Sequence, residues 1–308
     1  MSVLERVAGA PISWGVCEVP GWGRQLAPAT VLAEMAELGL SATELGPQDF
    51  LPGTAADKAR AAAEHGLRLI AAFVPVVLHA ALAEGSERSS GVADPLVVLG
   101  AAMDDLVVMG GEVLVVAAAA EASGYDTTYI LDDAQWDRLL SNLDRIVDAA
   151  AARGLIATLH PHVGTVIETP DDVARVIDGS RIPLCLDTGH LLIGGSEPAA
   201  LTRSHPERVG HVHLKDVRRD LAAAVREHRL GYSEAVAAGL YAPLGDGDLD
   251  FSEIITVLEE SGYRGWYVLE QDTVLSNARR DGDNDPGPVR DTRRSLDHLR
   301  AMTTGTSR

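Results

Sequence analysis

The chain has 308 residues and a formal net charge of −19, a length that suits one large α/β barrel or two ordinary domains. Its composition is 46% hydrophobic but only 4% aromatic, so the core must be aliphatic, as in buried parallel strands and their covering helices. The acidic charge argues against nucleic-acid and anionic-membrane partners, because binding to both depends on lysine and arginine.

Cysteine usage and the N-terminus indicate the compartment. Cys17 and Cys185 lie far apart and in no metal-type spacing, which is typical of reduced thiols in a protein core. The N-terminus lacks the basic and then apolar pattern of a signal peptide. The longest apolar run, Val113–Ala120, is too short to span a bilayer. We therefore expect a soluble, cytoplasmic protein.

Short apolar runs alternate with alanine-rich amphipathic segments along the whole chain. The runs predict eight strands, at Val7–Trp14, Ala42–Leu45, Leu67–Val74, Glu112–Ala118, Leu155–His160, Ile182–Leu186, Val209–Leu214 and Trp266–Glu270. The amphipathic segments predict helices at Pro28–Glu37, Ala55–His65, Pro95–Met109, Gln135–Arg153, Pro170–Ile177, Pro198–His205, Phe251–Ser261 and Val289–Met302.

This alternation predicts a single (β/α)8 TIM barrel over residues 1–308. The alternative is a doubly wound open sheet, which would want a glycine-rich phosphate turn after its first strand. The segment Gly9–Gly23 contains no such turn. In a barrel, the polar loops Ser86–Asp94 and Asn277–Pro288 and the extra segment Arg219–Leu240 are expected to border the mouth of the active site.

Polar residues gather where the predicted strands end, which is where a barrel places its active site. Asp187 follows the sixth strand and His190 comes three residues later, while His213 lies near the end of the seventh strand. Carboxylates and imidazoles converging from several strands are typical of a divalent-metal site. Taken alone, Asp187 could instead cap the helix that follows it, with His190 bonded to the backbone.

Two further segments place polar side chains on one side of an extended chain. His211, His213 and Lys215 alternate with apolar residues, so they share the inward face of their strand. His160 and His162 flank a proline that disfavours helix, so one imidazole is a candidate metal ligand and the other a candidate substrate contact. The alternative for this pair is one core histidine and one loop histidine.

Glu270 ends an apolar run, and a buried carboxylate there must be paired, ligated or protonated. Glu44 ends the second strand in the same way, as a substrate contact or as the partner of a neighbouring base. Trp14 and Trp22 lie near the first strand end, where aromatic side chains suit stacking on a sugar ring or simple packing. The candidate substrate contacts are Trp14, Glu44, His79, His162, His190 and Arg218.

Together these motifs resemble the xylose-isomerase-like TIM-barrel superfamily of sugar isomerases and epimerases. The resemblance covers nearly the whole chain and rests on APISWG, ATELGP, HPHVGTVIET, LDTGHLLIGG, HVHLKDVR, PLGDGDLDF and WYVLEQD. The DTGH, HLKD and final-glutamate motifs are specific for the superfamily. HPHVGT and HLKDVR narrow the resemblance to its members that dehydrate keto-inositols.

The resemblance implies a metal site at Asp187, His213 and Glu270, with Mn²⁺ or Co²⁺ favoured and Mg²⁺ or Zn²⁺ as alternatives. In the epimerases the fifth-strand ligand is usually glutamate, whereas this chain has His160. The fourth ligand is therefore open: His160 binds the metal, leaves the position to water or contacts substrate. The epimerases use two carboxylates on opposite faces of the substrate as bases, and this chain lacks one of them. The resemblance therefore favours a reaction with one base and one acid, such as dehydration.

The implied function is metal-dependent dehydration of a keto-inositol (an inosose) in myo-inositol catabolism. Glu270 is the favoured base, with His160 and His162 as rivals, and His190 or Lys215 is the acid. The alternatives are a sugar isomerase or epimerase, a non-catalytic sugar-binding protein, and a DNA-repair nuclease of the endonuclease IV type, which the acidic charge disfavours. The substrate class is a small polyol or keto-sugar. The stereochemistry of the substrate stays open, as does the oligomeric state, a homo-oligomer included.

Overall fold

The computed structural model describes residues 2–17, 19, 21–81, 92–120, 129–276 and 286–305. The loops Ser86–Asp94 and Asn277–Pro288 fall largely outside these residues, so their expected place at the mouth stays a prediction. Among the described residues, no helix combines the length and the apolar character needed to cross a bilayer.

A parallel sheet forms the centre of the molecule, with strand order β3-β2-β1-β11-β8-β7-β6-β5-β4. Its strands are β1 (Val7–Gly9), β2 (Ala42–Thr43), β3 (Arg68–Leu69), β4 (Ala71–Val76), β5 (Val113–Ala118), β6 (Ile156–Leu159), β7 (Leu184–Asp187), β8 (Val209–Leu214) and β11 (Tyr267–Leu269). The predicted third strand is thus divided into β3, which pairs with β2, and β4, which pairs with β5.

The sheet closes into a barrel at Ile70, between β3 and β4. The Ile70 N–H donates to the carbonyl oxygen of Thr43 on one side at 3.0 Å. Its own carbonyl accepts from the N–H groups of Glu112 and Val113 on the other side, at 2.8 and 3.1 Å. Because one residue bonds to both neighbours, the predicted eight-stranded barrel is confirmed and the open sheet is wrong.

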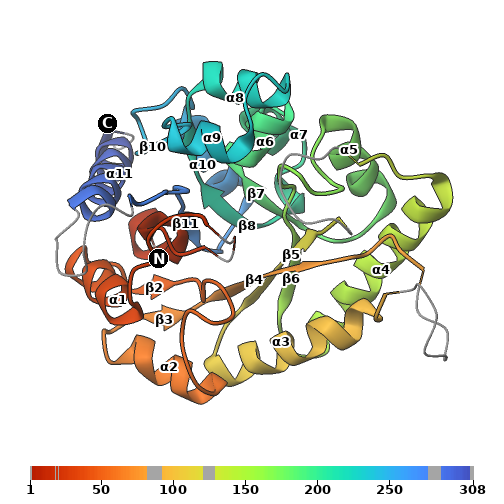
Figure 1. Cartoon of the computed structure of the whole chain (residues 1–308), viewed down its shortest axis with the longest axis horizontal. Coiled ribbons are helices and arrows are strands. Elements are labelled where there is room, and N and C mark those ends of the chain that lie inside the picture. The colour runs from red at the N-terminus through yellow and green to blue at the C-terminus, as the bar shows by residue number, and fades with distance from the viewer. Residues whose placement is uncertain are drawn as a thin grey trace.

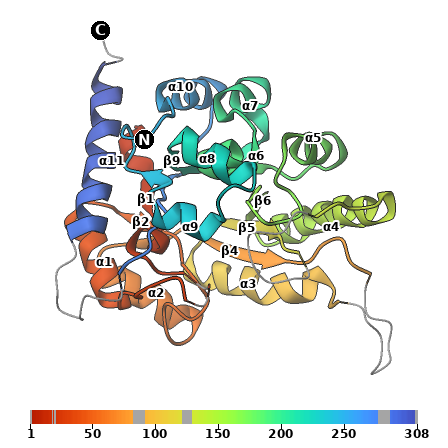
Figure 2. The ribbon, with the colours of Figure 1, turned by 45° about the horizontal axis from the view of Figure 1, so that its top comes forward.

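Helices surround the barrel, as Figure 1 shows and the tilted view of Figure 2 confirms. They are α1 (Pro28–Glu37), α2 (Ala55–Ala63), α3 (Pro95–Met109), α4 (Asp133–Ala151), α5 (Pro170–Gly179), α6 (Thr188–Gly194), α7 (Pro198–Ser204), α8 (Arg219–Arg226), α9 (Tyr232–Ala237), α10 (Phe251–Ser261) and α11 (Pro286–Gly305). The last helix, α11, lies beside α1 in both views and contacts the short 3-10 helix Val3–Arg6 that precedes β1, which closes the ring of helices.

Two segments differ from the prediction in ways that shape the site. The first predicted strand ends at Gly9, and Pro11–Trp14 forms a short 3-10 helix that stops at Gly15, whose φ is +76°. Pro11 starts this turn because it fixes its own φ and lacks an N–H for a ladder. The predicted extra segment contains α8 and α9, and it is tied down by an antiparallel pair, β9 (Asp216–Val217) with β10 (Tyr241–Ala242).

Candidate metal and active site

Four side chains converge at the carboxyl ends of neighbouring strands: His160 after β6, Asp187 on β7, His213 on β8 and Glu270 after β11. One ligand atom of each lies within 4.8 Å of the others. Asp187 Oδ2 is 3.5 Å from His160 Nε2 and also 3.5 Å from His213 Nδ1, while Glu270 Oε2 is 2.7 Å from His213 Nδ1. The four proposed metal ligands therefore form one cluster.

Asp187 serves two purposes at once. It is the last residue of β7 and the cap of α6, where its Oδ1 accepts a hydrogen bond from the His190 N–H at 2.7 Å. That bond fixes the carboxylate, so the second oxygen, Oδ2, faces the cluster. The helix cap and the candidate ligand were alternatives in the sequence, and the structure accommodates both on one side chain.

The cluster fits a divalent cation. Asp187 Oδ2, His213 Nδ1 and Glu270 Oε2 are buried, and each lies in an ion pair, but none of them makes a hydrogen bond of suitable geometry to a described residue. Buried polar atoms without hydrogen bonds are costly and rare. Two imidazole nitrogens and two carboxylate oxygens are a donor set suited to a borderline divalent metal. A bound cation would satisfy all three atoms.

His160 and His213 are each oriented by a contact at the ring nitrogen that does not face the cluster. His160 Nδ1 lies 2.8 Å from the carbonyl oxygen of Pro161, so this nitrogen carries the proton and Nε2 is left for the cluster. His213 Nε2 lies 2.9 Å from Glu44 Oε1, which leaves Nδ1 for the cluster. A carboxylate or carbonyl behind a ligating imidazole is the usual arrangement at metal sites.

Glu44 is held by two imidazoles. Its Oε1 lies 2.7 Å from His211 Nε2 as well as 2.9 Å from His213 Nε2. Burial alone would raise the pKa of Glu44, but the two histidines lower it well below its ordinary value. Of the two sequence-based alternatives for Glu44, the structure shows the pairing with a neighbouring base, although the side chain also lines the cavity.

Lys215 places a cation beside the cluster. Its ammonium donates to Asp272 Oδ1 at 2.8 Å and lies 3.3 Å from both Asp187 Oδ2 and Glu270 Oε2. Burial alone would lower the pKa of Lys215, but these three carboxylates raise it well above its ordinary value. The side chain is therefore protonated at neutral pH.

Two tyrosines, Tyr232 in the extra segment and Tyr241 on β10, complete this charged network. Tyr232, on α9, donates its hydroxyl to Asp272 Oδ2 at 2.5 Å, and its oxygen lies 3.0 Å from the Tyr241 hydroxyl. Asp272 was not predicted as a site residue, and the tyrosines were missed. Nothing in the sequence marks them, because their position depends on how the extra segment folds over the barrel.

A cavity of about 510 Å³ opens onto the cluster. This volume lies in the range of small-molecule sites and exceeds the need of one six-carbon ring. Its polar lining residues include Glu44, His160, His162, His213, Lys215, Tyr232, Glu270 and Asp272, with Gln48, Lys58 and Asp105 further along, and Trp22 and Phe73 are among the apolar ones. A cavity with both polar and apolar lining residues suits a polyol.

His162 and His190 stand together at one side of the cluster. Their rings stack with centroids 3.6 Å apart, and His162 alone of the two lines the cavity. Burial, with the charges of His160 and Lys215, lowers the pKa of His162 to about 3. Burial and His162 lower the pKa of His190 well below its ordinary value. Both rings are neutral, and His190 lies behind His162 as seen from the cavity.

Four predicted substrate contacts do not line the cavity: His190, described above, and Trp14, Arg218 and His79. Trp14 is fully buried and its indole donates to Glu34 of α1 at 2.7 Å, so it packs in the core. Arg218 is exposed and binds the carbonyl of Gly239 at the surface. His79 is buried beyond β4. Another aromatic side chain of the N-terminal segment, Trp22, lines the cavity.

Residues 32–302 match the family described as the xylose isomerase-like TIM barrel, and the chain belongs to this family. The chain is 33% identical over 282 residues to the inosose dehydratase of Geobacillus kaustophilus (strain HTA426), a match covering 88% of this chain and 89% of that protein. The family expected from the sequence motifs is therefore confirmed.

Two solved structures share the fold. D-allulose 3-epimerase from Methylomonas sp. in complex with D-allulose has a TM-score of 0.64 at 18% identity, covering 96% of both chains. The IolI protein with a bound zinc atom has a TM-score of 0.63 at 14% identity, covering 97% of both chains. At these identities the likeness is one of fold.

Proposed function

We propose that this chain is a metal-dependent hydro-lyase that removes water from a keto-inositol. The observation that carries the proposal is the cluster of His160, Asp187, His213 and Glu270 with the Lys215 ammonium beside it, all but Asp187 lining one cavity. The identity of 33% to an inosose dehydratase over most of both chains supports the same activity and substrate class.

The four cluster residues would hold the metal, and Mn²⁺ or Co²⁺ is our proposal, with Mg²⁺ and Zn²⁺ as alternatives. When bound, a divalent cation polarises the substrate carbonyl as a Lewis acid and acidifies the neighbouring C–H bond. His160 would thus be a ligand, since its Nε2 faces Asp187 Oδ2 and its Nδ1 is held by Pro161.

Glu270 is our candidate base for the proton on the carbon next to the carbonyl. Its carboxylate lines the cavity, and Lys215 and His213 lower its pKa although burial alone would raise it. The group is therefore ionised and able to accept a proton. His162 is the rival base: Val163 holds its Nδ1 at 2.7 Å, which makes Nε2 the basic nitrogen of a neutral ring.

Lys215 is our candidate acid. It lines the cavity and is protonated, whereas His190, the other candidate, lies behind His162 and is neutral. As Glu270 takes the proton from carbon, a carbon–carbon double bond forms and the β-hydroxyl leaves with a proton from Lys215, as water. The enol that results tautomerises to a dione.

The proposal is tested by incubating the protein with 2-keto-myo-inositol and Mn²⁺ and following products by nuclear magnetic resonance. We expect loss of one water, and no comparable reaction with a ketohexose. Products that are only stereoisomers of the substrate would instead support the epimerase alternative, which the fold shared with D-allulose 3-epimerase favours. Tight binding in calorimetry without turnover would support a sugar-binding protein.

A further inference from the structure

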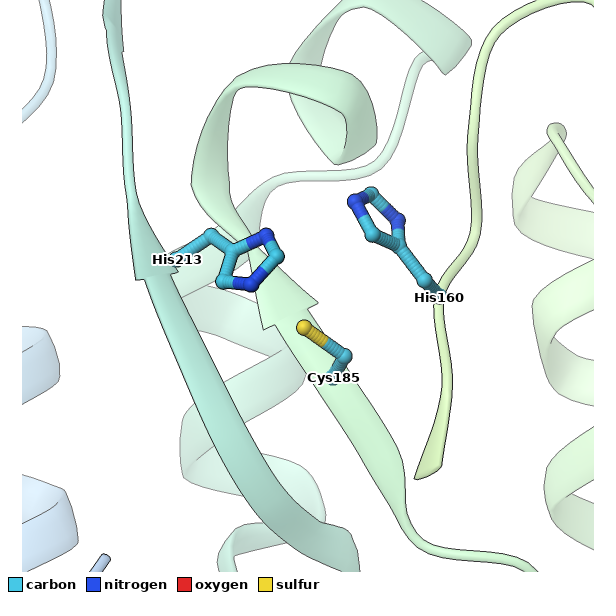
Figure 3. A group of neighbouring side chains, drawn as sticks. All are labelled: His160, Cys185 and His213. Atoms are coloured by element: carbon cyan, nitrogen blue, oxygen red, sulfur yellow. The ribbon is translucent and has the colours of Figure 1, made fainter. Parts of the chain in front are cut away.

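A thiol lies beneath the proposed metal site. Cys185 precedes Asp187 by two residues on β7, so both side chains point to the inside of the barrel. Cys185 pairs with His211 and Asp187 with His213 in the neighbouring strand, which places Cys185 one layer deeper. Figure 3 shows its sulfur pointing into the space between His160 and His213.

These three side chains form a second set of metal donors. One ligand atom each of His160, Cys185 and His213 lies within 4.8 Å of the others, and all three side chains are buried. In a tetrahedral site, a histidine nitrogen and a cysteine sulfur bound to one zinc ion are about 3.6 Å apart. Modest side-chain rotations would close that gap. The set shares both histidines with the cluster above, so one cation at a time can be bound.

We propose that Cys185, His160 and His213 form a deeper, alternative position for the thiophilic cation Cd²⁺. The inference rests on the metal site of the proposed function, because it uses the same two histidines. Thiolate ligands select soft cations, whereas carboxylates suit Mn²⁺ and Mg²⁺. The two layers therefore sort metals by ligand preference, with Asp187 and Glu270 above and Cys185 below.

Binding in the deeper position replaces the S–H bond with a sulfur–metal bond, and the proton passes to the buffer. The cation is then drawn away from Asp187 and Glu270 and from the cavity that would hold the substrate. Cd²⁺ should consequently displace Mn²⁺ and inhibit the enzyme. Metal selectivity would thus depend on a residue that takes no part in the reaction.

The test uses the metal-free full-length protein titrated with Cd²⁺, read by ultraviolet absorption. A thiolate bound to Cd²⁺ gives a charge-transfer band that thiols and carboxylates do not. We expect one equivalent of this band in the wild type and in Cys17→Ser, the control for the other cysteine. In Cys185→Ser the band should vanish. The affinity for Cd²⁺ should fall at least about 10-fold, because losing a ligand weakens binding no less than losing a group that only supports a ligand.

A companion variant separates this inference from the metal site itself. Asp187→Asn should lose Mn²⁺ affinity but keep the Cd²⁺ charge-transfer band, since Asp187 belongs only to the upper set. Cd²⁺ binding without the band, or a band that persists in Cys185→Ser, would overturn the deeper position and leave the proposed metal site standing. Failure to bind Mn²⁺, Co²⁺ and Cd²⁺ alike would overturn both. Cys185→Ala, checked by circular dichroism, covers the case in which the serine variant does not fold.

Discussion

His213 Nδ1 lies 2.7 Å from Glu270 Oε2, yet neither atom makes a hydrogen bond with suitable geometry to a described residue. Both atoms are buried at the point where two neighbouring strands, β8 and β11, end. The two atoms form an ion pair without a well-directed hydrogen bond, and a shared cation would satisfy both. Asp187 Oδ2, 3.5 Å from the same nitrogen, completes this geometry.

Replacing Glu44 by glutamine should weaken metal binding without disrupting the fold. The carboxylate of Glu44 holds Nε2 of His213, and such supporting contacts typically contribute 10- to 100-fold in metal affinity, so we expect a loss of about 10-fold or more. Equilibrium dialysis with Mn²⁺ measures the change. The matched control is Glu64→Gln on an exposed position after α2. Equal Mn²⁺ affinity in the two variants would contradict a role for Glu44 in metal binding.

Replacing Lys215 by methionine should separate chemistry from metal binding. The ammonium is our candidate acid, and general acids contribute about 10²- to 10⁴-fold to rate. We expect kcat to fall within that range while the protein still binds one Mn²⁺ per chain. Lys215→Arg, which keeps the charge but holds its proton too tightly to donate it, should be nearly as slow. Near-normal turnover in the methionine variant would assign the acid to another residue.

Tyr232→Phe tests whether the extra segment supports the active site. The substitution removes the hydroxyl that donates to Asp272 Oδ2, and Asp272 in turn holds Lys215. Losing a hydrogen bond of about 1 kcal/mol corresponds to about a 5-fold fall in kcat. Tyr241→Phe is the matched control, because its hydroxyl contacts Tyr232. A larger effect from Tyr241→Phe than from Tyr232→Phe would contradict this arrangement.

The strand-borne part of the site could be predicted because parallel strands bring their carboxyl ends to one edge. Asp187, His213 and Glu270 end or closely follow apolar runs, and their convergence follows from that rule. The side of a strand on which Lys215 lies follows from the two-residue alternation in the same way. The fold could also be predicted, because apolar side chains repeat about every two residues in a strand and about every 3.6 residues in a helix.

The remaining part depends on contacts between distant segments, which no local pattern encodes. Tyr232 reaches Asp272 only because α9 folds over the barrel mouth. Trp14 and Trp22 flank the same turn in the sequence, but Pro11 starts a 3-10 helix that turns Trp14 toward Glu34 of α1. Glu44 meets His211 and His213 across the barrel interior, from strands far apart in the chain.

The central claim is that a divalent cation held by His160, Asp187, His213 and Glu270 is required for turnover. Asp187→Asn tests it most directly, with Mn²⁺ content and dehydration of 2-keto-myo-inositol measured on the same samples and Asp148→Asn, an exposed position on α4, as control. We predict one Mn²⁺ per chain in the wild type and the control, and loss of both metal and turnover in Asp187→Asn. Full metal content and wild-type turnover in Asp187→Asn would contradict the claim.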